Sequence, residues 1–442
     1  MTMEGHTDEP PAYRQTPRRH RILGAGRFRH EHRYVLQDKS GRDWVSFRIK
    51  SRAADPKNTP LFFEGDTIRG EVQLDLAKAK TLKGLTITVR AGMTAVGQEE
   101  ELFLDITEPV WTPASTSEGK VVGQHRFPFS ITLPRDATIA PVPKAAPKCF
   151  SLPPTFSERA SPAYIDYRLF LTVRRGRLRV NKQLSTHFGF LPCTVAKPPS
   201  PLRALAYVEG GVILGPHADP EGWKVFDPVT ITGTLFKARE VSVECTLAVA
   251  TPFTFASNSP IPLFLTLHGT DTAALDMFAS APNLCLLRTI AVGSEAAEER
   301  GTRRSNNTFV SSVASAVFWP HDASASGRDT AAEVAIGDPD TRTLRGELFV
   351  PRGSKQSFTF PRFACSYSIA LLPPQVDGFD PLTAPEDPLL TESVTITMAS
   401  APGIIPSSQM PPSYEVLNEG NYNITTGFLE NGNQRFLHHH QQ

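Results

Sequence analysis

Two short segments, one near each end of the chain, share a pattern of two prolines, one variable residue and a tyrosine. Residues 10–13 read Pro-Pro-Ala-Tyr and residues 411–414 read Pro-Pro-Ser-Tyr. A proline pair favours the polyproline II helix, which loses little entropy when it docks on an aromatic groove, while the tyrosine ring enters a separate pocket. The pattern is typical of WW-domain ligands and predicts that these residues bind WW domains: Pro10, Pro11, Tyr13, Pro411, Pro412 and Tyr414. The alternative interpretation is that the prolines form ordinary turns.

Two such motifs reinforce one another when the partner carries several WW domains. The second contact is then intramolecular, and avidity exceeds either single affinity by about 100-fold or more if the span can be reached. Both motifs lie in segments whose composition predicts disorder. The first segment has seven arginines between Arg14 and Arg33, and the last is polar and slightly acidic. We therefore expect bivalent docking through accessible tails.

A run of arginines follows the longest alternating segment of the chain. Residues 174–179 read Arg-Arg-Gly-Arg-Leu-Arg. This run predicts a hairpin turn that gathers Arg174, Arg175, Arg177 and Arg179. Guanidinium groups match phosphate and carboxylate geometry, so the turn has the chemistry to contact phosphorylated or acidic cargo segments, or anionic lipid headgroups. The alternative is a solvated strand edge that resists aggregation, and the arginine-rich amino-terminal tail allows the same two interpretations.

The sequence contains none of the short motifs that mark common catalytic sites. It lacks a Gly-x-Ser-x-Gly elbow, a Walker loop and a His-Glu-x-x-His pair. The acidic run at 99–101 is most simply a solvated edge, and the three histidines at 438–440 cannot enforce metal geometry from a flexible tail. A net charge of +1 gives no basis for nucleic-acid binding. We therefore predict a protein without catalytic residues, cofactor, metal site or nucleic-acid partner.

Cysteine content and hydropathy predict a cytoplasmic protein. The five cysteines are odd in number and widely spaced, which fits neither a disulfide framework nor a zinc ribbon. Cys245 and Cys365 lie in alternating apolar runs and are predicted to be small buried hydrophobes. No apolar run approaches the ~20 residues that span a bilayer, and the amino terminus has no apolar leader.

The elements that must position these segments are β-strands. Helix interiors exclude proline, so 39 prolines in 442 residues disfavour a helical fold. From residue 44 onward, apolar side chains recur at every second position in runs of five to nine residues, as in half-buried strands. Only two short helices are predicted, at 202–208 with Ser200 as cap and Pro201 in the first turn, and at 272–278 after Asp271. We predict an all-β fold of two tandem β-sandwiches.

The same pattern divides the chain into five parts. These are a disordered basic tail at 1–38, a first β-sandwich at 39–195, a hinge at 196–222, a second β-sandwich at 223–400 and a disordered tail at 401–442. The openings of the two sandwiches echo one another, because Gly70 and Gly233 each lie between apolar residues at alternate positions, 163 residues apart. We interpret the echo as two copies of one sandwich.

Several of these segments resemble the arrestin family. The stretches Phe63-Glu-Gly-Asp-Thr-Ile-Arg-Gly-Glu-Val72, Phe127-Pro-Phe-Ser-Ile-Thr-Leu-Pro134, Leu152-Pro-Pro-Thr-Phe156 and Ile165-Asp-Tyr-Arg-Leu169 resemble the arrestin amino-terminal domain. Ile261-Pro-Leu263 and Ile231-Thr-Gly233 resemble the carboxy-terminal domain. The resemblance covers about residues 40–400, and the tail motif at Pro411, Pro412 and Tyr414 is similar to that of fungal arrestin-related trafficking adaptors. It implies two tandem immunoglobulin-like (arrestin-type) β-sandwiches with disordered tails.

The resemblance implies a non-catalytic adaptor. Such a protein recruits a WW-domain HECT-type ubiquitin ligase to plasma-membrane transporters or receptors, which are then ubiquitinated and internalised. It is expected in the cytoplasm, recruited to the plasma membrane and endosomes. The arginine-rich segments, independently of the resemblance, add an anionic membrane surface as a further predicted partner. The alternative is a ligase-independent, retromer-like scaffold for cargo sorting or signalling. The motif at 10–13 and the loop at 135–151 depart from the usual family arrangement.

The distribution of lysines limits where this chain could itself be ubiquitinated, as its proposed relatives are. Only 14 of the 46 basic residues are lysines, and none precedes Lys39 or follows Lys355. An acceptor must therefore lie between these two positions. The predicted acceptors are four lysines assigned to loops of the first sandwich: Lys57, Lys120, Lys144 and Lys148.

Overall fold

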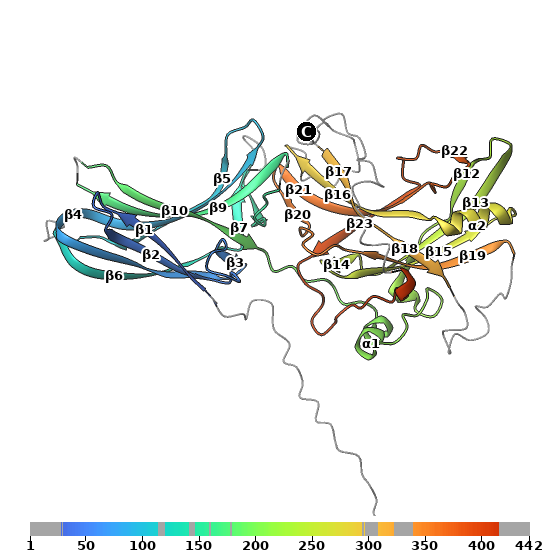
Figure 1. Cartoon of the computed structure of the whole chain (residues 1–442), viewed down its shortest axis with the longest axis horizontal. Coiled ribbons are helices and arrows are strands. Elements are labelled where there is room, and N and C mark those ends of the chain that lie inside the picture. Colours follow the sequence, from blue (N-terminus) through green and yellow to red (C-terminus); the bar gives the residue numbers. More distant parts are fainter. Residues whose placement is uncertain are drawn as a thin grey trace, which may run out of the picture.

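The computed structural model describes residues 28, 30–113, 120–140, 146–158, 161–176, 179–293, 296, 308–321 and 339–414. Over these ranges the chain is mostly β-strand, with two α-helices, α1 and α2. The predicted all-β character is thereby confirmed. Figure 1 shows the strands in two groups, one blue to green and the other green through yellow to red, joined by a single crossing of the chain.

The first group of strands spans residues 30–191. Its strands are β1 (His30–Gln37), β2 (Asp43–Ser51), β3 (Leu61–Phe63), β4 (Thr67–Ala95), β5 (Glu101–Trp111), β6 (Lys120–Thr132), β7 (Asp136–Ile139), β8 (Lys148–Ser151), β9 (Ala163–Arg175) and β10 (Lys182–Leu191). An eight-stranded sheet has the order β1-β2-β4-β9-β10-β3, with β5 and β6 also paired to β4, and β7 and β8 form a separate ribbon.

β4 is the central strand of the first group, because it pairs with four other strands. Its first part pairs with β2 and β6 and its second part with β5 and β9. The alternation predicted from the sequence is present in both parts: Val72 and Leu74 are buried in the first, and Ile87 and Val89 in the second. These side chains belong to one continuous apolar core that also contains residues of the second group.

The first group begins earlier than the sequence predicted. β1 lies inside the stretch 1–38, which was assigned to a disordered tail, and pairs along its whole length with β2. Its alternation is hidden by polar residues, since the buried position His32 is a histidine. The imidazole Nδ1 lies 3.0 Å from the Pro56 carbonyl and Nε2 lies 2.8 Å from Ser51 Oγ, and burial lowers the pKa of His32. Hydrogen bonds replace apolar packing here, which periodicity of hydropathy does not detect.

The second group spans residues 201–397. Its elements are α1 (Pro201–Glu209), the 3-10 turn η1 (Pro220–Gly222), β11 (Trp223–Val225), β12 (Val229–Leu235), β13 (Arg239–Ala250), β14 (Thr254–Ala256), β15 (Pro260–His268), α2 (Thr272–Ser280), β16 (Asn283–Val292), β17 (Thr308–Ser315), β18 (Val317–Pro320), β19 (Thr341–Phe349), β20 (Phe358–Phe360), β21 (Phe363–Leu372), β22 (Phe379–Pro381) and β23 (Leu390–Thr397). One sheet has the order β18-β19-β15-β13-β12-β22 with β11 beside β13, and another has the order β14-β23-β21-β16-β17 with β20 beside β21.

Both predicted helices are confirmed together with their caps. Ser200 caps α1, where its Oγ accepts a hydrogen bond from the Arg203 amide, and Pro201 occupies the first turn. Asp271 caps α2 by accepting from the Ala274 amide at 3.0 Å. The sequence detects these helices because capping chemistry is local to one turn of chain.

The two glycines of the predicted echo have the same structural use. Gly70 lies directly opposite Phe129 in the β4–β6 ladder, and Gly233 of β12 pairs with Pro381 of β22 and lies against the ring of Phe379. A Cβ atom added to either glycine would lie 2.6 Å from the neighbouring phenylalanine ring. Each glycine therefore leaves room for an aromatic ring to cover the strand backbone.

Candidate functional site

The carboxy-terminal Pro-Pro-Ser-Tyr motif lies on the surface of the second group of strands. Residues 412–414 form one 3-10 turn, in which the Tyr414 amide donates to the Pro411 carbonyl at 2.9 Å. The half-buried Tyr414 ring lies against Trp319 of β18, with centroids 6.4 Å apart and planes inclined by 45°. A polyproline II ligand is extended. The motif is therefore turned and docked in this structure, and residues 401–414 differ from the disordered tail predicted for them.

A buried carboxylate holds the chain just ahead of this motif. Glu347 of β19 is only 2% exposed. Its Oε2 accepts a hydrogen bond from the Ser408 hydroxyl and its Oε1 accepts one from the Gln409 amide, both at 2.5 Å. Burial raises the pKa of Glu347, and the hydrogen bonds from Ser408 and Gln409 act in the opposite direction. Hydrogen bonds to a buried carboxylate are among the stronger ones in proteins, so this contact anchors the C-terminal segment, residues 401–414.

The side chain of Gln409 ties the C-terminal segment to the loop that follows α1. Its Nε2 donates to the Gly211 carbonyl at 2.7 Å, and its Oε1 accepts from the Ile213 amide at 2.9 Å. Both polar ends of this side chain are thus used. The amide acts as a clamp between two stretches separated by almost two hundred residues, and no local sequence signal could have identified it.

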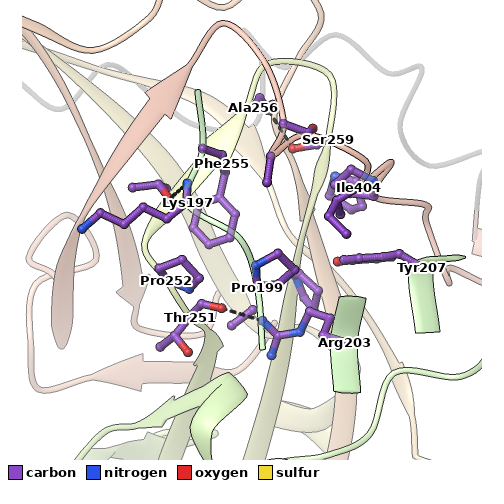
Figure 2. A pocket seen from close by; sticks show the side chains of 18 residues that line it. Lys197, Pro199, Arg203, Tyr207, Thr251, Pro252, Phe255, Ala256, Ser259 and Ile404 are labelled. Carbon is purple, nitrogen blue, oxygen red and sulfur yellow. Dashed lines mark hydrogen bonds between the residues drawn. The ribbon is translucent and has the colours of Figure 1, made fainter. Parts of the chain in front are cut away.

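A pocket lies beneath the start of the C-terminal segment, between the hinge, α1 and β13–β15 (Figure 2). Its walls are mainly apolar, with Pro252, Phe255 and Ile404 among them. Among its polar groups, Arg203 Nη1 donates to the Thr251 carbonyl at 2.9 Å, a contact drawn as a dashed line in Figure 2. Burial lowers the pKa of Arg203. The described lining includes neither a carboxylate nor a histidine, so it supplies no acid–base pair.

The predicted arginine hairpin lies where β9 ends and β10 begins. Arg174 and Arg179 are exposed, and Arg177 lies outside the described residues. Arg175 lies over the ring of Trp44 at 5.9 Å, and Lys80 from β4 lies over the same ring at 4.2 Å. The sequence did not associate Lys80 and Trp44 with the hairpin, because strand pairing alone brings them together.

The acidic run at 99–101 is exposed, as predicted for a solvated edge, and two of its residues also form ion pairs. Glu100 pairs with Arg168 of β9, and Glu101 pairs with Arg362, which lies between β20 and β21. The second pair joins the two groups of strands. Such a partner, 261 residues away in the sequence, cannot be inferred from the run itself.

Aromatic rings and one further ion pair also join the two groups. Phe103 packs on Phe360 with centroids 4.9 Å apart, and Phe156 packs on Phe363 at 5.0 Å. Arg288 Nη1 donates to both oxygens of one carboxylate, that of Glu158, at 3.0 and 3.1 Å. These contacts join the two groups of strands directly, and none of them involves the hinge residues 196–222.

The remaining predicted sites are placed only in part. Lys57 is exposed in the loop between β2 and β3, whereas Lys120 and Lys148 are exposed at the first positions of β6 and β8 and do not lie in loops. The other site residues lie outside the described ranges: Pro10, Pro11, Tyr13 and Lys144.

Cysteine placement agrees with the sequence. Cys245 and Cys365 are buried, as predicted, and burial raises the pKa of Cys245 to about 12 and that of Cys365 to about 11. These thiols are therefore protonated near neutral pH. Within the described ranges there is no cluster of three or more histidine, cysteine, aspartate or glutamate side chains that could hold a metal ion.

Comparison with protein-family models and with curated proteins finds no match. No family model matches the chain, and no curated protein shows significant similarity to it. In the part of the chain that the structure describes, neither helix has the length and apolar character needed to cross a membrane. Any assignment of function therefore rests on the chain's own residues and on the family resemblance of its motifs.

Proposed function

We propose that this chain is a non-catalytic, arrestin-like adaptor that recruits a WW-domain HECT-type ubiquitin ligase to plasma-membrane transporters or receptors for ubiquitination and endocytosis. In this proposal the two groups of strands are tandem immunoglobulin-like β-sandwiches of the arrestin type. The protein works in the cytoplasm and is recruited to the plasma membrane and endosomes. Cargo binds the folded part and the ligase binds the two Pro-Pro-x-Tyr motifs.

The observation that carries the proposal is the placement of the second motif. Pro411–Tyr414 lies on the surface after the last strand, where Pro412 and Ser413 are exposed and Tyr414 is half-buried. A WW domain reads an extended segment of this composition. Release of the C-terminal segment from Trp319 and Glu347 would present the motif without disruption of any strand.

The test is binding of the full chain to an immobilised pair of tandem WW domains. We expect Tyr13→Ala and Tyr414→Ala each to weaken binding by about 10- to 100-fold, because each removes bivalency, and the double variant to abolish it. The matched controls are Ala12→Ser and Ser413→Ala, which exchange the variable residues of the two motifs and should leave the dissociation constant within about twofold. Unchanged binding by the double variant would rule the proposal out.

The docked state of Tyr414 favours a second candidate, a ligase-independent scaffold for cargo sorting or signalling. If the motif serves only to pack against Trp319, the tails are dispensable for traffic. Cargo internalisation in cells that carry only the Tyr13→Ala, Tyr414→Ala variant separates the two. Arrested internalisation supports the ligase adaptor, and normal internalisation supports the scaffold.

A further inference from the structure

Four separate stretches of chain meet at the end of the first group of strands that lies farthest from the second group (Figure 1, left). They are 38–44, which connects β1 to β2, the middle of β4 at 77–84, the start of β6 at 120–122, and the described parts of the β9–β10 hairpin at 174–176 and 179–182. Strand register joins them, since Thr81 pairs with Lys120 and Leu82 pairs with Arg175. We call these four stretches the basic end.

The basic end carries a large excess of positive charge. Its described basic residues are Lys39, Arg42, Lys78, Lys80, Lys83, Lys120, Arg174, Arg175, Arg179 and Lys182, and its described acidic residues are Asp38 and Asp43. Asp43 pairs with Arg33 and Arg42 with Asp75, so these charges are balanced. Eight others form no ion pair in the described part of the chain: Lys39, Lys78, Lys80, Lys83, Arg174, Arg175, Arg179 and Lys182.

Contacts within the basic end hold several of these charges close together. Lys80 and Arg175 both lie over the indole ring of Trp44, which is buried. The pKa of Lys80 is lowered by burial and by the neighbouring charges of Arg175 and Arg179, and Asp38 acts in the opposite direction. Like charges held together in a folded protein have an electrostatic cost, which a negatively charged partner removes.

Exposed apolar side chains lie among the charges. Val180, at the turn of the β9–β10 hairpin, is 85% exposed, and Val122, near the start of β6, is 57% exposed. The phosphate group of a phosphorylated peptide gains no binding free energy from a neighbouring valine side chain. A membrane interface accepts such side chains at the boundary of headgroups and acyl chains while the basic groups contact anionic lipid.

We propose that the basic end binds the surface of an anionic membrane, with lysine and arginine side chains at the headgroups and Val180 in the interface. This orients the long axis of the first group of strands toward the bilayer. The site lies at the opposite end of that group from the contacts with the second group, which carries the C-terminal motif, so it does not depend on WW-domain binding. A phosphorylated cargo peptide is the competing occupant, and the test separates the two.

The test measures partition of the full chain onto vesicles by co-sedimentation. We expect little binding to phosphatidylcholine, and binding to vesicles with about 20% phosphatidylserine that is lost between 0.1 and 0.5 M salt because screening shortens the range of the attraction. The variant Lys83→Gln, Arg174→Gln, Arg179→Gln removes three exposed charges. At about fivefold per charge, we expect its partition coefficient to fall by roughly 100-fold.

The matched control removes the same number of charges elsewhere. Lys57→Gln, Lys237→Gln, Arg352→Gln changes three exposed basic residues outside the basic end and should retain at least a third of wild-type partition. The apolar contact is tested by Val180→Asn, expected to lose about three- to fivefold, against Leu382→Asn, an equally exposed apolar residue of the second group that should have no effect. Circular dichroism and melting of each variant report whether the fold is retained.

Each outcome decides the proposal. Salt-sensitive binding to anionic vesicles that the basic-end variant loses and the control retains supports it, as does unchanged vesicle binding by Tyr13→Ala, Tyr414→Ala. Absence of wild-type binding to anionic vesicles at 0.1 M salt overturns it. Equal losses in the basic-end variant and its control also overturn it. If a multiply phosphorylated peptide binds the wild type and loses affinity for the basic-end variant while vesicle binding stays intact, the site is for phosphopeptides and the membrane proposal fails.

Discussion

The ring of Tyr414 lies against the ring of Trp319, so the residue that a WW domain would bind is already packed on the protein's own surface. Both contacts cannot be made at once, because a WW domain needs the extended motif and its tyrosine ring. If the motif binds WW domains as proposed, its apparent affinity is proportional to the fraction of molecules in which the C-terminal segment is undocked. Variants that loosen the segment are expected to bind WW domains more tightly.

Loss of the Gln409 clamp should increase WW-domain affinity. Gln409→Ala removes the hydrogen bonds to Gly211 and Ile213, each worth about 1 kcal/mol. In a Tyr13→Ala background we expect a single WW domain to bind roughly three- to tenfold more tightly, measured by titration calorimetry. Gln98→Ala, in an exposed turn, is the control. An affinity equal to that of the control would show that docking does not compete with the partner.

The pH dependence of stability should reveal the buried Glu347. Burial raises its pKa in the folded protein, so below the ordinary value of about 4.3 its carboxyl is protonated in both folded and unfolded states. The protonated carboxyl makes its full contribution to the free energy of unfolding below the unfolded-state pKa. That contribution is lost as pH rises through the folded-state pKa. We therefore expect the wild type to gain stability relative to Glu347→Gln as pH falls from 7 toward 4.5, in urea unfolding.

The glutamine variant keeps the hydrogen bonds of the C-terminal segment, because its amide oxygen can accept from Gln409 and its amide nitrogen can donate to Ser408. The comparison thus isolates the titration from the loss of docking. Glu240→Gln, at an exposed position of β13, controls for the loss of one negative charge. If the difference in unfolding free energy between the wild type and Glu347→Gln stays constant from pH 7 to 4.5, the prediction is contradicted.

The ion pair between Glu158 and Arg288 should couple the two groups of strands. Both side chains are about three-quarters buried, with exposed fractions of 25% and 22%. In a double-mutant cycle with Glu158→Gln and Arg288→Met, we expect a coupling free energy of about 1–2 kcal/mol in urea unfolding. The pair of Arg90 with Asp105, whose side chains are 44% and 43% exposed, serves as control, and we expect it to couple by less than about 1 kcal/mol. Equal coupling for the two pairs would contradict the prediction.

Alanine at the two echoed glycines should destabilise the protein. The added Cβ would clash with a backbone carbonyl of the neighbouring strand, that of Arg48 at Gly70 and that of Asp380 at Gly233, and would also meet a phenylalanine ring at 2.6 Å. Each variant should therefore lose about 1–3 kcal/mol of unfolding free energy. Gly211→Ala is the control, because there the nearest atom would be 3.9 Å away. If both alanine variants unfold at the wild-type midpoint, the neighbouring strands and rings shift to accept the Cβ without cost, and the prediction is wrong.

The local features of this fold could be read from the sequence. Alternating apolar residues predicted the buried faces of β4, β9 and β13, and Ser200 and Asp271 predicted the two helix starts. These signals are local because a strand face repeats every two residues and a cap acts within one turn. β1 was missed, because its buried position is a hydrogen-bonded histidine that hydropathy counts as polar.

The sequence by itself therefore determined that the chain is built of strands, where its two helices begin and where its Pro-Pro-x-Tyr motifs lie. Only the tertiary structure decided that Tyr414 is docked, that Glu347 anchors the segment before it, and that Lys80 joins the arginines of the β9–β10 hairpin. Each of these contacts joins residues tens to hundreds of positions apart. Register and strand order set such contacts, and local composition carries no record of either.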